Sequence, residues 1–195
     1  MKREDWNRKH GEAGLLFGAE PNRFLVAEVA GLPPGRALDL ACGSGRNAVW
    51  LAQQGWSVVA ADFADVALDQ ARALAAERGV DVEWVDADLR EWEPPARAFD
   101  LVVVLYLQLP PEELGPIMRH AAGAVAEGGT MLVVGHHSEN LASGIGGPKD
   151  PRVLFTPEDV ASELDGLEVE RAEAVIRTVE GEGDAIDALV RARRA

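Results

Sequence analysis

Short apolar runs rich in β-branched residues alternate along the chain with longer stretches rich in Ala and Leu. The apolar runs predict strands at 37–40, 57–61, 82–85, 101–105 and 131–135. The longer stretches predict helices at 46–54, 66–78, 111–126 and 157–164. This alternation is typical of βαβ units, which build a parallel sheet with helices on both faces. The pattern therefore predicts an α/β fold.

The end of the chain has a different pattern. Two strand-like stretches, 167–174 and 185–192, are joined by the polar turn EGEGD without a helix between them. A parallel neighbour needs a crossover of about a dozen residues or more, so this pair must be antiparallel. Before it, HHSENLASGIGGPKDP (136–151) is a long Gly/Pro/Ser loop directly after a strand. Loops of this length in compact domains are usually functional or mobile.

Length, charge and cysteine usage narrow the class of protein. The 195 residues fit a single domain, 1–195, of ordinary globular composition, with 47% hydrophobic and 27% charged residues. A net charge of -14 repels phosphate backbones, so we expect no nucleic-acid partner. Cys42 is the lone cysteine, the start MKREDWNRKH has no apolar signal core, and no apolar stretch approaches the roughly 20 residues of a membrane span. We therefore expect a soluble cytoplasmic protein, monomeric or homodimeric, with no membrane partner.

The segment LDLACGSGRN, residues 38–47, carries the main candidate for ligand binding. Gly43 and Gly45 follow an apolar run and precede a predicted helix, and such a turn lets the backbone approach a ligand closely. Asp62 ends the next predicted strand, where a carboxylate can accept hydrogen bonds from both hydroxyls of a ribose. Together these features predict a nucleoside cofactor.

Asp39, together with Asp88 and the terminal hairpin, separates two classes of cofactor. The loop also satisfies GxGxxA through Gly43, Gly45 and Ala48, which keeps a nicotinamide-dependent oxidoreductase as an alternative. However, a pyrophosphate on the helix N-terminus would be repelled by Asp39, with little basic charge nearby. A ligand that carries an ammonium and a sulfonium but no phosphate would instead favour nearby carboxylates. S-adenosylmethionine is such a ligand.

The motifs, taken in order, resemble the class I S-adenosylmethionine-dependent methyltransferase family. They are DLACGSGRN from Asp39, VVAAD ending at Asp62, then DADL, FDLVVVLY and AEGGTMLVV. The GRN ending and the short N-terminal segment look most like the tellurite-resistance and thiopurine methyltransferase branch. The resemblance covers roughly residues 15 to 135. It implies a Rossmann-like, seven-stranded, mostly parallel sheet with helices on both faces and an antiparallel seventh strand between strands five and six.

The resemblance also implies a set of cofactor contacts. Asp39 would neighbour the amino-acid end of the cofactor, Asp62 would hold the ribose hydroxyls, and Phe63 would pack on adenine. Asp88 would accept from the adenine amino group, and Val104 would present a carbonyl near the ammonium. The full set is Asp39, Ala41, Cys42, Gly43, Gly45, Asn47, Asp62, Phe63, Asp88, Leu89 and Val104.

The first 30 residues form a separate segment of the prediction. In the resembled branch this segment covers the cofactor and helps to close the acceptor pocket, which implies that Trp6 and Phe17 line it. The alternative is a helix that packs on the edge of the sheet. His10 and His120 are expected at the surface rather than as ligands.

The predicted activity is in-line transfer of the methyl group to an O, S, N or chalcogen nucleophile of a small-molecule acceptor, with S-adenosylhomocysteine as product. A hydroxyl acceptor needs a base, and the histidines at the functional edge are His136 and His137. We predict His136 as the base and Tyr106 as a second catalytic group, with His137 and the loop 136–156 on the substrate side. No metal is expected, because adjacent histidines on a strand point to opposite faces. A non-catalytic S-adenosylmethionine-binding or regulatory module stays as an alternative.

Overall fold

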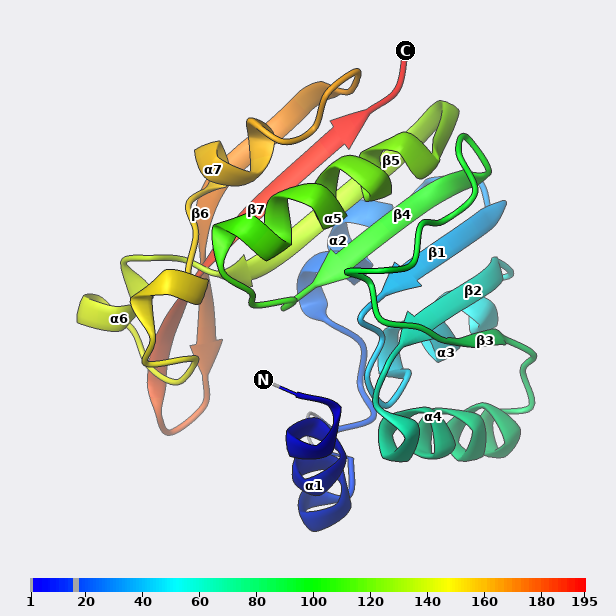
Figure 1. The fold of residues 1–195 in the computed structure, drawn as a ribbon, viewed down its shortest axis with the longest axis horizontal. Coiled ribbons are helices and arrows are strands. Elements are labelled where there is room, and N and C mark those ends of the chain that lie inside the picture. The colour runs from blue at the N-terminus through cyan, green and yellow to red at the C-terminus, as the bar shows by residue number, and fades with distance from the viewer. Residues whose placement is uncertain (1, 16–17) are drawn as a thin grey trace. The chain divides into compact units, whose positions relative to one another are not determined.

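The computed structural model describes residues 2–15 and 18–195, and its strands form a seven-stranded sheet in the order β3-β2-β1-β4-β5-β7-β6 (Figure 1). β7 pairs antiparallel with both β5 and β6, whereas the β1–β2, β2–β3 and β4–β5 pairs are parallel. The predicted insertion of an antiparallel last strand between strands five and six is therefore confirmed. The strands are β1 (Arg36–Leu40), β2 (Ser57–Asp62), β3 (Glu83–Asp86), β4 (Phe99–Leu105), β5 (Val125–His136), β6 (Glu168–Val179) and β7 (Gly183–Arg193).

Residues 1–93 form the first of two compact units. Its central strand β1 is almost wholly buried, with Ala37, Leu38 and Leu40 at most 1% exposed. A continuous apolar run of this kind is typical of a parallel strand that is covered on both faces. The helices α3 (Arg46–Gln53) and α4 (Asp65–Arg78) follow β1 and β2 and pack against each other, as the predicted βαβ pattern requires.

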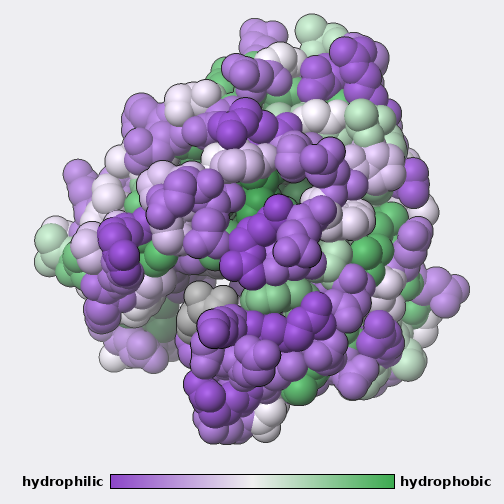
Figure 2. All heavy atoms as spheres, viewed as in Figure 1, coloured by the Kyte–Doolittle hydropathy of each residue, from purple (hydrophilic) through white to green (hydrophobic). Residues whose placement is uncertain are grey.

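Two further helices precede the first strand of this unit. α2 (Arg23–Val29) is capped by Asn22, whose side-chain oxygen accepts hydrogen bonds from the backbone N–H groups of Phe24 and Leu25. α1 (Arg3–Ala13) lies beside α4 (Figure 1). Figure 2 shows its surface in purple, since its residues are nearly all hydrophilic. The alternative predicted a helix that packs on the edge of the sheet. α1 instead packs on the helix α4.

Residues 94–195 form the second unit, in which β4 and β5 are flanked by α5 (Pro111–Ala124). β5 is longer than predicted. It begins at Val125 rather than at Met131, so the preceding helix also ends two residues earlier than expected. The early part of β5 pairs with β4 through an irregularity between Phe99 and Leu101, which extends the ladder across the glycines at 128–129.

The long loop after β5 is folded against the second unit. It contains the short helix α6 (Asn140–Ser143) and a 3₁₀ turn (Pro151–Val153), and it leads into α7 (Pro157–Ala161), which is shorter than the predicted helix 157–164. Asn140 is 1% exposed. Its side chain accepts from the Ile186 N–H at 2.7 Å and donates to the carbonyls of Ile145 and Gly146. These bonds tie the loop to β7.

A single glycine sets the distance between the loop after β1 and the elements behind it. Gly45 has φ +77°, and a Cβ there would lie 2.7 Å from Ala71 Cβ and from the Trp84 ring. We expect Gly45→Ala to lower the free energy of unfolding by about 2–5 kcal/mol, because overpacking adds to left-handed backbone strain. Urea denaturation measures this loss.

Gly79→Ala is the matched control, since Gly79 has φ +65° with nothing within 4 Å of its added Cβ. It should show the backbone cost alone, about 1–2 kcal/mol. Equal losses in the two variants would contradict the packing role of Gly45.

Candidate functional site

The loop between β1 and α3 is held in an uncommon backbone conformation. Ala41, which directly follows β1, has φ 58°, a left-handed value for a residue with a side chain. Such conformations cost of order 1–3 kcal/mol and cluster at ligand-binding sites. In the second unit, Tyr106 directly follows β4 and has φ 60°. Each unit therefore carries one strained non-glycine residue at the carboxyl end of a strand where a functional residue was predicted.

Asp62 holds the loop after β1 in place. At the end of β2 its Oδ2 accepts from the Gly43 N–H at 2.8 Å, and its Oδ1 accepts from the Ala64 N–H at 2.9 Å. The side chain is 9% exposed, and burial raises the pKa of this carboxyl although both hydrogen bonds oppose the rise. Each carboxylate oxygen has a second acceptor direction, so Asp62 keeps the capacity to bind hydroxyl groups.

Asp39 lies within β1 and is 1% exposed. Burial raises its pKa to about 7, the negative charge of Asp62 adds to the rise, and Arg46 and the Ala48 N–H oppose it. Its Oδ2 has no hydrogen-bond partner among the residues that the structure describes. A buried carboxylate oxygen without a donor is costly, and a cationic or N–H-bearing ligand would relieve that cost.

A ring of hydrogen bonds connects α1 to the glycine loop. The Ser44 hydroxyl donates to Gln70 Oε1 at 2.8 Å, and the Gln70 amide donates to the His10 carbonyl at 2.9 Å. The Ser44 proton is thus engaged, so His10 Nδ1, at 3.1 Å from Ser44 Oγ, must be the donor in that contact. His10 is 3% exposed, and burial lowers its pKa. The expectation of a surface His10 was wrong, because α1 covers this side chain against the loop.

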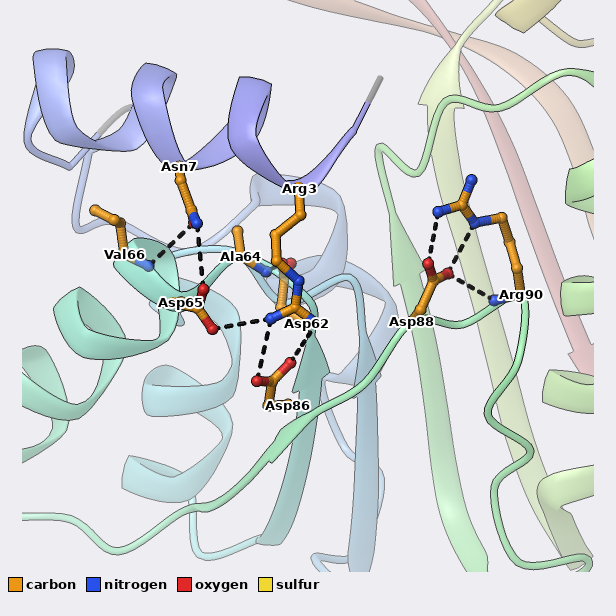
Figure 3. Close-up of polar contacts among 9 residues, drawn as sticks. All are labelled: Arg3, Asn7, Asp62, Ala64, Asp65, Val66, Asp86, Asp88 and Arg90. Atoms are coloured by element: carbon orange, nitrogen blue, oxygen red, sulfur yellow. Dashed lines mark hydrogen bonds and ion pairs between the residues drawn. The ribbon is translucent and has the colours of Figure 1, made fainter.

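Ion pairs anchor the first turns of α1 (Figure 3). Arg3 reaches Asp65 at the start of α4 and Asp86 at the end of β3, each at 2.9 Å. Its guanidinium also lies 5.9 Å from the centre of the Phe63 ring. Asn7 binds the Asp65 carboxylate and accepts from the Val66 N–H, both at 3.2 Å. α1 is therefore fixed over the segment 63–66, which directly follows β2.

Asp88 lies in the turn after β3 and is paired with Arg90 (Figure 3). The Arg90 Nε donates to Oδ1 at 2.8 Å and the Arg90 backbone N–H donates to the same oxygen at 3.1 Å. The hydrogen bond from the Arg90 side chain is the main reason why the pKa of this carboxyl is lowered. The role of Asp88 toward adenine stays a prediction, and so does that of the neighbouring Leu89.

Other predicted residues have structural partners. The Asn47 side-chain oxygen accepts from the Asn22 N–H at 2.8 Å, so it anchors the segment before α2. Cys42 is buried, and desolvation raises the pKa of its thiol well above the usual value. Trp6 stacks on His10 at 5.9 Å between ring centres. Val104 lies in β4 opposite Val133. Phe17 lies outside the described residues.

A second polar cluster lies in the second unit, at the ends of β4 and β5. Asp187 on β7 is completely buried, and its Oδ2 accepts from the Tyr106 hydroxyl at 2.7 Å and from Arg177 Nε at 2.8 Å. Its Oδ1 lies 3.2 Å from His136 Nδ1. Burial alone would raise the pKa of Asp187, but contacts with His136, Arg177 and Tyr106 together lower it.

Sequence reasoning missed Asp187 and Arg177. The available signal was an aspartate inside the apolar strand AIDALV, where a charged residue needs a buried partner. The structure also separates the two adjacent histidines. His137 Nδ1 accepts from the Glu139 N–H at 3.0 Å, and the His137 N–H donates to the Ile186 carbonyl. His137 therefore supports the turn after β5, while His136 contacts the Asp187 carboxylate.

Within residues 2–15 and 18–195, no group of three or more His, Cys, Asp or Glu side chains is arranged to hold a metal ion. No helix in the described part of the chain has the length and apolar character needed to cross a membrane.

Residues 37–129 match the family model of a methyltransferase domain. A trans-aconitate 2-methyltransferase from Rhodopseudomonas palustris is 32% identical over 135 residues, which are 66% of this chain and 49% of that protein. The chain spans about half the length of the curated relatives it matches.

Solved structures show the same fold. TehB from Haemophilus influenzae superposes with a TM-score of 0.75 at 17% identity, covering 100% of this chain and 68% of that one. A magnesium protoporphyrin IX methyltransferase from Synechocystis, solved with bound S-adenosylhomocysteine, gives 0.74 at 17% identity, covering 99% and 97%. The predicted Rossmann-like methyltransferase fold is thereby confirmed. The predicted resemblance to the tellurite-resistance and thiopurine methyltransferase branch stays a prediction.

The raised pKa of Asp39 predicts a pH dependence of stability. Because the folded protein binds this proton more tightly than the unfolded chain, with a pKa of about 7 against 3.8, stability should fall as pH rises between these values. Asp39→Asn should therefore be more stable than the wild type at pH 8, by up to about 4 kcal/mol, and equal to it near pH 4. Denaturant unfolding at several pH values measures the difference.

Asp69→Asn provides the control, because Asp69 is an exposed carboxylate on α4. A difference between Asp39→Asn and wild type that does not change with pH would contradict the assignment.

Proposed function

We propose that this chain, with a methyltransferase-domain sequence over residues 37–129 and the Rossmann-like methyltransferase fold, is an S-adenosylmethionine-dependent methyltransferase acting on a small-molecule acceptor. The observation that carries the proposal is the pair of buried carboxylates around the loop after β1. Asp39 has a side-chain oxygen without a donor among the described residues, and Asp62 has acceptor capacity beyond its two backbone bonds. Asp39 suits an ammonium group, and Asp62 suits the hydroxyls of a ribose.

The charges at this loop favour such a cofactor over a dinucleotide. Burial is the main reason why the pKa values of Asp39 and Asp62 are raised, and the negative charge of Asp62 adds to the cost of ionising Asp39. A pyrophosphate would add further negative charge to this region, whereas a sulfonium and an ammonium would compensate it. Cofactor binding should therefore stabilise the ionised form of Asp39.

In this proposal α1 covers the cofactor. The helix is fixed over Phe63, the residue assigned to adenine, through Arg3, and it reaches the glycine loop through His10 and Ser44. A covering helix excludes water, which strengthens electrostatic contacts to the bound molecule. Trp6, on the same helix, is proposed to line the acceptor side.

The protein's contribution to methyl transfer is mainly orientation and desolvation, because the sulfonium already activates the methyl carbon. For a hydroxyl acceptor, His136 is proposed as the base and Tyr106 as a neighbouring group. A thiol or chalcogen acceptor would need less help, because its anion forms more readily. A turnover assay against hydroxyl, carboxyl, thiol and chalcogen compounds would identify the class of acceptor. Binding of cofactor without turnover on any of them would favour a non-catalytic module.

Asp62→Ala should weaken S-adenosylmethionine binding by roughly 2–4 kcal/mol, since hydrogen bonds to a charged group contribute about 1.5–3 kcal/mol each. Isothermal titration calorimetry measures the affinity, and circular dichroism verifies the fold. Asp69→Ala should bind like the wild type, because its side chain is 79% exposed on α4. NADH should produce no thermal stabilisation in any of these proteins. Unchanged affinity in a folded Asp62→Ala protein, or stabilisation by NADH alone, would refute the proposal.

Arg3→Ala removes the ion pairs that hold the start of α1. We expect faster dissociation of the cofactor by about tenfold and faster proteolytic cleavage between α1 and α2, because the cover opens more often. Stopped-flow measurement of cofactor release and limited proteolysis test both effects.

Arg8→Ala is the matched control on the same helix, since the Arg8 side chain pairs locally with Asp5, one turn away on α1. It should leave both rates unchanged. Equal effects of the two substitutions, or none from Arg3→Ala, would contradict a covering role for α1.

A further inference from the structure

The cross-strand register brings His136 and Asp187 together. In the antiparallel β5–β7 pair, His136 lies directly opposite Asp187, so their side chains occupy the same face of the sheet. His136 is the last residue of β5, and its side chain is 14% exposed, whereas Asp187 is fully buried. The pairing therefore places a carboxylate behind an imidazole that still reaches the surface.

The two oxygens of Asp187 differ in their partners. Oδ2 receives hydrogen bonds from Tyr106 and Arg177, while Oδ1 faces His136 Nδ1 at 3.2 Å. Neither Oδ1 nor Nδ1 makes a well-aligned hydrogen bond within the described residues. An unprotonated Nδ1 would direct a lone pair at a carboxylate, which is repulsive. Nδ1 must therefore carry a proton, and a small rotation of the imidazole would align it.

Two further groups lie close to the imidazole and limit its movement, and Arg177 contacts its neighbours. The Tyr106 ring lies 5.1 Å from the imidazole, centre to centre, and the Tyr106 hydroxyl donates to Asp187. On the loop, a Cβ at Gly147 would lie 3.0 Å from His136 Cγ, so the backbone crosses close to the ring. Arg177 lies 5.7 Å from the centre of the Tyr106 ring and neutralises Asp187.

We propose that Asp187 and Arg177 are positioning residues that hold His136 in the Nδ1–H tautomer, so that Nε2 accepts the proton of a hydroxyl-bearing acceptor. This inference rests on the proposed methyltransferase function. The acceptor oxygen forms a bond to the methyl carbon as its proton passes to Nε2. The carbon–sulfur bond breaks, and its electron pair stays on the sulfur of S-adenosylhomocysteine. The imidazolium formed is stabilised by Asp187 and later releases its proton to water.

Arg177 has a separate role, which is to balance the negative charge of Asp187. A carboxylate beside an imidazole favours the imidazolium, which cannot act as a base. The Arg177 guanidinium offsets that charge through its bond to Asp187 Oδ2. Removal of Asp187 and removal of Arg177 should therefore move the pH dependence of kcat in opposite directions.

The test is nitrogen–proton correlation NMR of the full chain labelled with ¹⁵N at histidine, with His136→Gln to assign the His136 signals. Wild type at neutral pH should show the Nδ1–H tautomer. Asp187→Asn should move the pH dependence of kcat to lower pH, and Arg177→Gln should move it to higher pH. Asp184→Asn, on the same strand but exposed, should change neither the tautomer nor this pH dependence.

An Nε2–H tautomer in the wild type, or shifts of the same sign in the Asp187→Asn and Arg177→Gln proteins, would overturn the inference. If Asp187→Asn fails to fold, the wild-type tautomer and the Arg177→Gln shift still decide it. Because the tautomer is measured without turnover, a failure of this inference can be distinguished from a failure of the methyltransferase proposal. In that case the Nδ1–H tautomer persists, but S-adenosylmethionine causes no thermal stabilisation.

Discussion

The pair of hydrogen bonds accepted by Asp62 is the interaction on which the first unit depends. β1 and β2 are parallel neighbours with Leu40 opposite Ala61, so the residue that follows this pair on β2 lies beside the loop after β1. There the Asp62 carboxylate receives the N–H groups of Gly43 and Ala64 and connects the glycine loop to the start of α4. Without it, two backbone donors would lose their acceptor in a largely buried place.

Two buried carboxylates in this protein show that neighbouring groups decide whether the pKa of a buried carboxyl is raised or lowered. Asp39 and Asp187 are both at most 1% exposed. The pKa of Asp39 is raised, because burial dominates and one oxygen lacks a donor among the described residues. The pKa of Asp187 is lowered, because His136, Arg177 and Tyr106 together outweigh burial. Asp39 is thus suited to respond to a cationic ligand, whereas Asp187 is suited to orient a neighbour.

The attachment of α1 depends on polar contacts rather than on an apolar face. Its one fully buried side chain among the described residues is His10, which takes part in a hydrogen-bonded ring with Ser44 and Gln70. Arg3 adds two ion pairs whose partners are half exposed, and such pairs are individually weak. A helix held in this way can open without exposing apolar core. That property agrees with the proposed role of α1 as a cover over the cofactor.

The sequence by itself determined the order of strands and helices, because hydrophobic periodicity depends only on which residues face a core. It also indicated the position of the glycine loop after the first strand and of Asp62 at the end of the second. Both features can be recognised from residues that lie close together in the sequence. The cluster of Tyr106, His136, Arg177 and Asp187 was decided by tertiary structure alone. Its members come from four strands or strand ends, and the β4–β5, β5–β7 and β6–β7 registers bring them together. The burial of His10 had the same origin, because a polar helix gives no periodic signal of the surface it covers.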